Sequence, residues 1–170
     1  MIKEKLGFTL TELMAVVIIV SILAVLGAGY YRKSVEQSRF TELLSITNSI
    51  AEAVNRYVME KQAAGVAIEN IGVPHFRDLD ISFSSCAGNL NTCSIKGRYQ
   101  VTMESREHVI GWNTKSMLSA GERYQIRVNT HFGSPKDQVA CTFPSENARS
   151  FCESMGFTDC TDNTCTKPIR

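Results

Sequence analysis

Residues 7–31, GFTLTELMAVVIIVSILAVLGAGYY, contain the feature from which the organisation of the whole chain can be worked out. Nearly every residue from Leu13 to Ala28 is apolar, and Ser21 is the only hydroxyl among them. Counted from Phe8, the stretch is close to the ~20 residues that a helix needs to cross the core of a bilayer. We therefore expect a membrane-spanning helix over residues 8–29.

The residues before this helix are short and polar. Residues 1–7 carry Lys3 and Lys5 against Glu4, and positive charges tend to stay on the cytoplasmic side of a membrane. The C-terminus is then expected to lie outside. An ordinary secretory signal has a small-x-small cleavage site beyond its apolar core, whereas here an acid, Glu12, lies inside the apolar segment. A carboxylate in lipid costs several kcal/mol unless it is paired, so Glu12 predicts a partner.

The helix is expected to continue past the membrane edge to about Gln62, before Gly65. At ~1.5 Å per residue such a helix is roughly 80 Å long, and much of it must pack against something other than lipid. Residues 30–64 are amphipathic, with an apolar stripe at spacings of three and four: Leu43, Ile46, Ile50, Val54, Tyr57 and Val58. Ile50, Val54 and Tyr57 are expected to be buried, whereas Glu36 and Arg39 should face solvent or a neighbouring subunit.

The rest of the chain has the composition of a small globular head. Residues 65–97 are rich in glycine and turn-forming residues and are expected to be an irregular connection. Alternating polar and apolar residues predict strands at 98–103, 109–112, 124–129 and 138–141, and a short helix is expected between 145 and 156. The last ten residues are expected to be a loop. The predicted fold is therefore α+β, in which the long helix covers a small antiparallel sheet within residues 98–170.

Composition gives no sign of a nucleic-acid-binding protein. The 170 residues have a formal net charge of +1, and the 44% hydrophobic content is raised by the apolar run. Five cations gather in the strand region among tyrosines, which makes a DNA-binding surface conceivable: Lys96, Arg98, Arg106, Arg123 and Arg127. Acidic residues lie among them, so a solvated sheet face is the favoured interpretation.

Motifs for catalysis or metal binding are missing from the sequence. His75, His108 and His131 are scattered without the spacing of metal ligands. Acids and amides near the C-terminus, among them Asp159 and Asp162, lack the spacing of a calcium loop. No nucleophile elbow or phosphate-binding loop is present. We therefore predict no enzyme, no cofactor and no metal site.

Six cysteines without any C-x-x-C pair, behind an export segment, predict disulfides formed in an oxidising compartment. Six cysteines permit 15 pairings. We favour three local bridges, each around a short loop with turn residues: Cys86 to Cys93, Cys141 to Cys152, and Cys160 to Cys165. The alternative joins Cys141 to Cys160 or Cys165 and ties the last strand to the tail.

The stretch from Gly7 to Leu13 resembles the class III leader and N-terminus of type IV pilins and pseudopilins. The resemblance is specific from Gly7 to about Tyr31, and it implies that a prepilin peptidase removes residues 1–7 by cleaving between Gly7 and Phe8. It also implies N-methylation of Phe8 and places Glu12 at the family's glutamate, the fifth mature residue. In an apolar filament core, the amine of Phe8 in one subunit and Glu12 of its neighbour would neutralise each other.

The sequence departs from the usual family pattern in three places. Thr11 replaces a common apolar residue, Ser21 a common glycine, and Gly29 the proline found in many pilins. A proline kink is therefore not expected. Gly27 and Gly29 can still let the helix loosen on assembly, because glycine weakens a helix by about 1 kcal/mol.

The resemblance implies a pilin that inserts in the bacterial inner membrane and then polymerises, through an inner-membrane assembly platform, into a surface filament for adhesion, motility or DNA uptake. One alternative is a pseudopilin of a type II secretion system, which assembles in the periplasm. Six cysteines and a sizeable head favour the pilin. Another alternative, of a different class, is a monomeric anchored or secreted binding protein, and a hydrolase is a more distant one.

Overall fold

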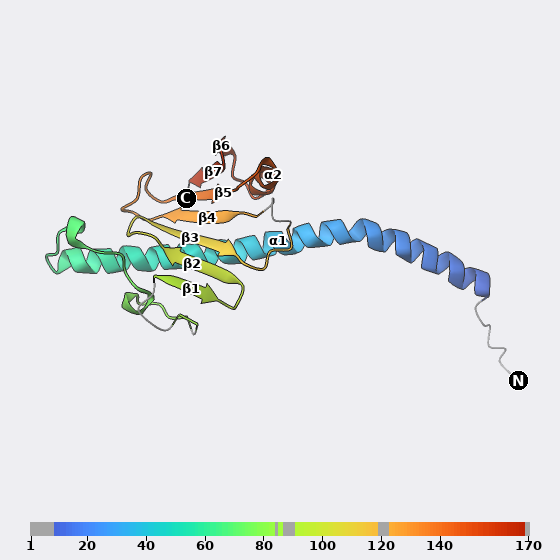
Figure 1. Ribbon diagram of the computed structural model, residues 1–170, viewed down its shortest axis with the longest axis horizontal. Coiled ribbons are helices and arrows are strands. Elements are labelled where there is room, and N and C mark those ends of the chain that lie inside the picture. Colours follow the sequence, from blue (N-terminus) through green and yellow to red (C-terminus); the bar gives the residue numbers. More distant parts are fainter. Residues whose placement is uncertain (1–8, 84, 87–90, 119–122, 169–170) are drawn as a thin grey trace, which may run out of the picture.

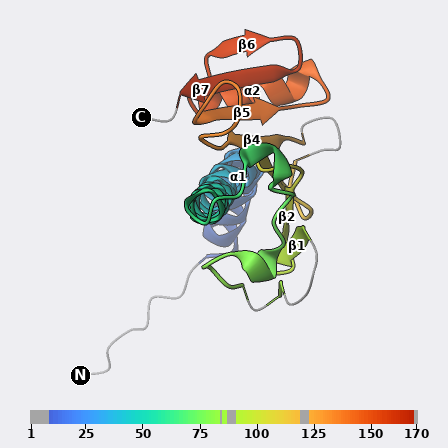
Figure 2. The same cartoon turned by 90° about the vertical axis from the view of Figure 1, so that its left-hand side faces the viewer.

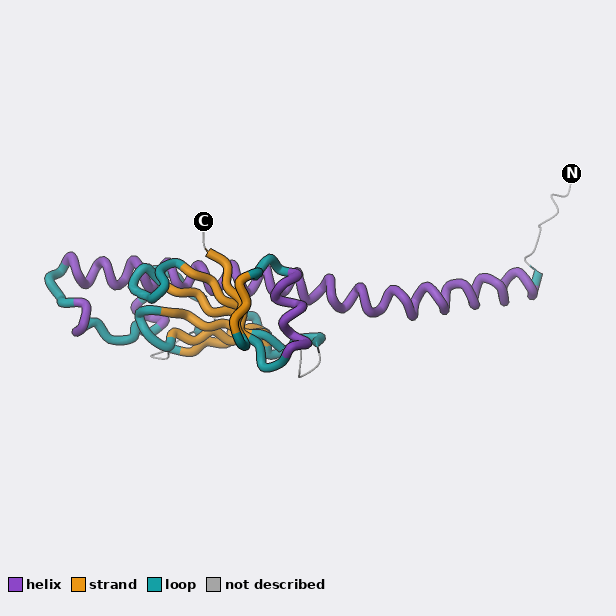
Figure 3. Tube along the Cα trace, turned by 90° about the horizontal axis from the view of Figure 1, so that it is seen from above, coloured by secondary structure: helices purple, strands orange, loops and turns teal. Residues whose placement is uncertain are grey.

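The computed structural model describes residues 9–83, 85–86, 91–118 and 123–168, and it consists of one long helix and a seven-stranded sheet (Figure 1). Helix α1 runs without a break over Leu10–Ala63, so its 54 residues span about 80 Å. Only its C-terminal half contacts the sheet, and the other half extends beyond the head (Figure 3). The expected long helix is confirmed.

The sheet is entirely antiparallel, in the order β1-β2-β3-β4-β5-β7-β6. Its strands are β1 Thr92–Ile95, β2 Tyr99–Met103, β3 His108–Asn113, β4 Gln125–Asn129, β5 Gln138–Thr142, β6 Asp159–Thr161 and β7 Thr164–Pro168. Short 3-10 turns, η1 Ile68–Asn70 and η2 Phe76–Asp78, and helix α2, Glu146–Ser154, complete the head. Figure 2 looks along α1 and shows the sheet on one side of it. The α+β class is as predicted.

Four strands and the short helix lie close to their predicted positions, because alternating burial follows the alternating sequence. In β2, for example, Tyr99, Val101 and Met103 are buried and the residues between them are half-exposed. Two expectations were wrong. Strand β1 lies within the 65–97 segment expected to be irregular, and β7 lies within the last ten residues expected to be a loop. Both contain threonine and cysteine and few large apolar residues, so their periodicity is weak.

The core lies between α1 and the inner face of the sheet. Leu43, Ile50, Val54 and Val58 of the predicted stripe have no exposed surface, whereas its other two members, Ile46 and Tyr57, are only half-buried. Phe40, one turn before Leu43, is also fully buried. Gly111 of β3 allows the closest approach to the helix: a Cβ at this position would lie 2.5 Å from Oγ1 of Thr47 and 3.0 Å from Cδ1 of Leu43.

Aromatic rings join α2 to the core. Phe40 of α1 has its ring centroid 5.0 Å from that of Tyr124 and 5.8 Å from that of Phe151, and Tyr124 and Phe151 stack at 4.9 Å. Such pairs contribute about 0.5–1.5 kcal/mol each beyond the area they bury. The cluster fixes the last third of the head against the helix.

Three disulfides hold the segments that have few apolar residues. Cys86–Cys93 ties the connection after η2 to β1, Cys141–Cys152 ties β5 to α2, and Cys160–Cys165 joins β6 to β7. These are the pairs of the local map favoured from the sequence. Each closes a short loop, which in the chain-entropy account stabilises the fold by roughly 2–3 kcal/mol per bridge.

Candidate assembly helix and its anchor in the head

The N-terminal half of α1 presents an apolar surface that no described part of the chain covers. Every described residue before Val35 is exposed, and the most apolar window of the helix has none of its residues buried. Its large exposed side chains are Leu10, Leu13, Met14, Val16, Val17, Ile18, Ile19, Val20, Ile22, Leu23, Val25, Leu26, Tyr30 and Tyr31. Among the described residues, α1 is the one helix long and apolar enough to cross a membrane. A surface of this extent requires lipid or other apolar helices around it.

Glu12 lies in the first turn of α1, where it forms a capping box with Thr9. The backbone N–H of Thr9 donates to Oε2 of Glu12 at 2.8 Å, and the backbone N–H of Glu12 donates to Oγ1 of Thr9 at 3.3 Å. Two N–H groups that a helix start leaves unpaired are satisfied in this way. The Glu12 side chain is exposed, so its carboxylate remains accessible to a second chain. Gly7 and Phe8, the predicted cleavage and methylation residues, lie outside the described residues.

The helix passes Gly27 and Gly29 without a break, and a Cβ at either glycine would meet nothing within 4 Å. Ser21, another departure from the pattern of the resemblance, donates its hydroxyl to the Val17 carbonyl oxygen at 2.7 Å. That bond satisfies the hydroxyl within its own helix, as an apolar surrounding demands.

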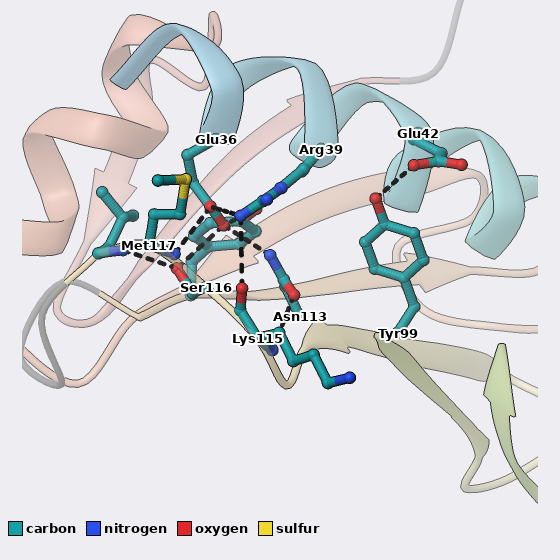
Figure 4. A network of polar contacts seen from close by, with 10 residues as sticks. Glu36, Arg39, Glu42, Tyr99, Asn113, Lys115, Ser116 and Met117 are labelled. Atoms are coloured by element: carbon teal, nitrogen blue, oxygen red, sulfur yellow. Dashed lines mark hydrogen bonds and ion pairs between the residues drawn. The ribbon is translucent and has the colours of Figure 1, made fainter. Parts of the chain in front are cut away.

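Glu36 anchors the helix to the head, which corrects the expectation that it faces solvent. Its side chain has no exposed surface. Its carboxylate accepts hydrogen bonds from Nδ2 of Asn113 at 2.8 Å, Oγ of Ser116 at 2.9 Å and the backbone N–H of Met117 at 3.2 Å (Figure 4). The Tyr124 hydroxyl donates a fourth hydrogen bond, at 3.2 Å. A buried carboxylate is stable only with such a set of donors.

Arg39 supplies the countercharge for this network, so it is also not the simple surface residue expected. Its Nη1 lies 3.4 Å from Oε2 of Glu36, and the same atom donates to the Lys115 carbonyl oxygen at 3.4 Å. Burial, together with the Glu36 charge, raises the pKa of Tyr124 far above its usual range. Tyr124 therefore remains a neutral donor. Ser116 and Met117 also donate to the Glu36 carboxylate, so charge-assisted hydrogen bonds hold the segment after β3 to α1.

A second polar contact lies closer to the middle of the head. Glu42 of α1 accepts hydrogen bonds from Nζ of Lys96 and from the Tyr99 hydroxyl, the second of which is drawn in Figure 4. Both contacts lower the pKa of Glu42, and the contact with Lys96 has the larger effect. Burial and the contact with Glu42 raise the pKa of Tyr99 to about 12. The helix is thus attached at both Glu36 and Glu42 to the sheet side of the head.

The burial of Glu36 has one signal in the sequence, its spacing along the helix. Glu36 precedes Phe40, Leu43 and Thr47 at helical spacings, so it extends the buried stripe by one turn. Its donors come from positions 77 to 88 residues later, which periodicity cannot supply.

Each histidine of the described chain has a separate local partner. His75 contacts Asp78, His108 contacts Glu104, and His131 contacts Asp137. Within the described ranges, no three side chains of histidine, cysteine, aspartate or glutamate gather as they would around a metal ion.

Comparison with known proteins agrees with this architecture. The chain is 32% identical over 98 residues to the type IV major fimbrial protein FimA of Dichelobacter nodosus. The matched segment covers 58% of this chain and 60% of the length of that curated relative. No protein-family model matches the chain, and no solved structure matches it. A long apolar helix packed on an antiparallel sheet is consistent with a type IV pilin fold, and the similarity to a fimbrial protein supports a relationship to type IV pilins.

Proposed function

We propose that this protein is a structural subunit of a type IV pilus-like filament. The observation that carries the proposal is the uncovered apolar half of α1, which begins at an accessible acid and continues without a joint into the core of the head. Such a helix needs apolar neighbours at every turn. Lipid provides them in a single-pass precursor of the bacterial inner membrane, and the same helix of other subunits provides them in an extracellular filament. The similarity to a fimbrial protein supports this assignment.

Assembly in this proposal begins with processing by a prepilin peptidase between Gly7 and Phe8, followed by methylation of the Phe8 amine. The amine then pairs with Glu12 of a neighbouring subunit on the assembly platform. A charged pair in an apolar core costs less than either charge alone. The apolar faces hold the subunits together, and the pair sets the axial register between them. Adhesion, motility and DNA uptake are functions of the polymer.

Processing is tested with Gly7→Trp. The variant is expected to stay as an uncleaved precursor in the inner membrane, whereas Gly27→Leu, which changes a glycine beyond the junction, should be cleaved normally. Immunoblots of membrane fractions and N-terminal sequencing of filaments give the readout. A filament subunit that begins at Met1, or beyond Ala28, contradicts the proposed junction.

Assembly is tested with Glu12→Ala. Cleavage and membrane insertion should remain, since alanine is less costly in lipid than a carboxylate, but the protein should be lost from sheared surface filaments. Glu60→Ala, which changes an exposed acid near the other end of α1, is the matched control. Filaments of Glu12→Ala at the wild-type level contradict the pairing. Recovery of the wild-type protein only from the periplasm would favour the pseudopilin, and recovery only as a monomer would favour an anchored binding protein.

A further inference from the structure

The face of the sheet opposite α1 carries an aromatic and amide-bearing row across three strands. Gly111, Ile126 and Cys141 face the helix. Because side chains alternate along a strand, the residues adjacent to them in sequence, Trp112, Gln125 and Thr142, point to the outer face. Trp112 of β3 lies opposite Gln125 of β4, and Gln125 lies opposite Thr142 of β5. Three side chains of different chemistry therefore lie side by side on the outer face.

A hollow of about 550 Å³ lies over this row. Besides Trp112, Gln125 and Thr142, its lining includes Arg123, Pro144 and Asn163. Ligand pockets in proteins typically measure about 300–1,000 Å³ and combine an apolar wall with a few polar groups. The indole and the proline ring supply the apolar wall here, and the polar groups are amides, hydroxyls and the guanidinium of Arg123.

Some polar side chains of this hollow, among them Asn113 and Tyr124, are bonded to Glu36, but three others have no partner within the described part of the chain. The side chains of Arg123, Gln125 and Asn163 neither donate nor accept a hydrogen bond, and form no ion pair, with any residue that the structure describes. Other arginines of the head are paired: Arg56 donates to Asp80 at 2.6 Å, and Arg149 to Glu153 at 2.9 Å. A guanidinium whose donors meet no acceptor among the described residues, in a hollow that it shares with a half-exposed indole, is a place where a ligand can supply the missing acceptors.

We propose that this hollow, lined by Trp112, Arg123, Gln125 and Asn163, binds a sugar that carries a carboxylate. A pyranose ring has an apolar face that packs flat on an indole. Side-chain amides offer a donor and an acceptor together, which is what a ring hydroxyl uses. The guanidinium pairs with a carboxylate through two parallel N–H···O bonds. The binding site goes beyond the proposed filament role, which needs only α1.

A single-stranded nucleic acid fits the hollow less well. Such ligands are held by a track of several cations along successive phosphates, together with stacking side chains. Among the described residues that line this hollow, Arg123 is the one cation, and the other polar groups are neutral amides and hydroxyls. The lining therefore favours a ligand with one negative charge and several hydroxyls.

Trp112 provides the readout, because it is the only tryptophan of the chain. The full chain is titrated in an uncharged polyoxyethylene detergent, which contains no sugar to compete. Two pairs of probes are used, each of an acidic sugar and its neutral match: sialyllactose with lactose, and trigalacturonic acid with its methyl ester. The first pair tests a sialic acid as the ligand, and the second tests a uronic acid. We expect a saturable change of Trp112 fluorescence with at least one of the two acids. That acid should bind at least tenfold more tightly than its neutral match. No change with either acid overturns the proposal, as does equal binding of acid and neutral match.

Variants locate the interaction. Arg123→Gln removes an exposed cation that pairs with no described residue, and it should weaken binding of the acid at least tenfold, with little effect on the neutral match. Lys136→Gln removes one exposed positive charge elsewhere and should bind like the wild type. Unchanged affinity in Arg123→Gln overturns the proposal. Saturable binding of oligothymidylate that is tighter than binding of both acids also overturns it, in favour of a nucleic-acid site.

Discussion

The carboxylate of Glu36 in α1 accepts a 2.8 Å hydrogen bond from the side-chain amide of Asn113, which is 77 residues away in sequence at the end of β3. Three further donors and the guanidinium of Arg39 complete the shell around this fully buried acid. The position of the long helix relative to the sheet is therefore fixed by polar groups as well as by the apolar stripe. Fixed donors around one carboxylate tolerate little sliding of the helix.

Glu36→Ala should lower the free energy of unfolding by about 3–5 kcal/mol, because it leaves the guanidinium of Arg39 and several buried donors without their acceptor. Glu52→Ala, which changes an exposed acid on the same helix, should stay within about 0.5 kcal/mol of wild type. Urea unfolding of the full chain in detergent, followed by Trp112 fluorescence, measures both. Equal midpoints for Glu36→Ala and wild type would show that the network is not structural.

Gly111→Ala should destabilise the head by about 1–3 kcal/mol, because the added methyl group would lie 2.5 Å from Oγ1 of Thr47. Gly72→Ala is the matched control, since a Cβ there meets nothing within 4 Å. Thr47→Ala should recover part of the loss when combined with Gly111→Ala, and a double-mutant cycle in urea measures that coupling. A strictly additive double variant would place the strain elsewhere.

Stability should fall at high pH through Tyr99. Its folded pKa is about 12, whereas an unfolded tyrosine titrates near ~10. A raised folded pKa means that the stabilisation is complete below the unfolded pKa and is lost as pH rises through the folded pKa, so the window is about pH 10 to 12. Tyr99→Phe should therefore be less stable than wild type at pH 7, and the difference should shrink by on the order of 1–2 kcal/mol across that window. Urea midpoints at several pH values give the comparison, and a constant difference up to pH 12 contradicts it.

Peptide mapping of unreduced protein should recover Cys141 linked to Cys152. Trypsin alone cannot separate the alternatives, because Cys152, Cys160 and Cys165 remain together in the peptide that follows Arg149. A second cut after Glu153 divides Cys152 from the other two. Recovery of Cys141 on the fragment with Cys160 and Cys165 would show the alternative tail pairing.

The sequence was sufficient for the features with strong periodicity. The long helix, the buried positions Ile50 and Val54, and strands β2 to β5 follow from spacings of three to four or of two residues. Helical spacing reaches Glu36, but it could not predict a buried carboxylate there, because that depends on donors from the end of β3, from the segment after it and from Tyr124. The outer hollow was also missed, because it exists only when Trp112, Gln125 and Asn163 are brought together from separate strands and turns. The edge strands β1, β6 and β7 likewise depend on backbone hydrogen bonds to their neighbours and on disulfides more than on an alternation of polar and apolar residues.

The unbroken course of α1 has a mechanical consequence. A pull applied at the N-terminal end of the helix reaches its C-terminal end through main-chain hydrogen bonds aligned with the axis, and no flexible joint lies in between. The head enters this load path where Glu36, Phe40 and Glu42 contact it, while the β6–β7 hairpin, closed by Cys160–Cys165, lies to one side. Tension applied along the helix therefore leaves this hairpin unloaded, and changes in its sequence should not weaken the rod.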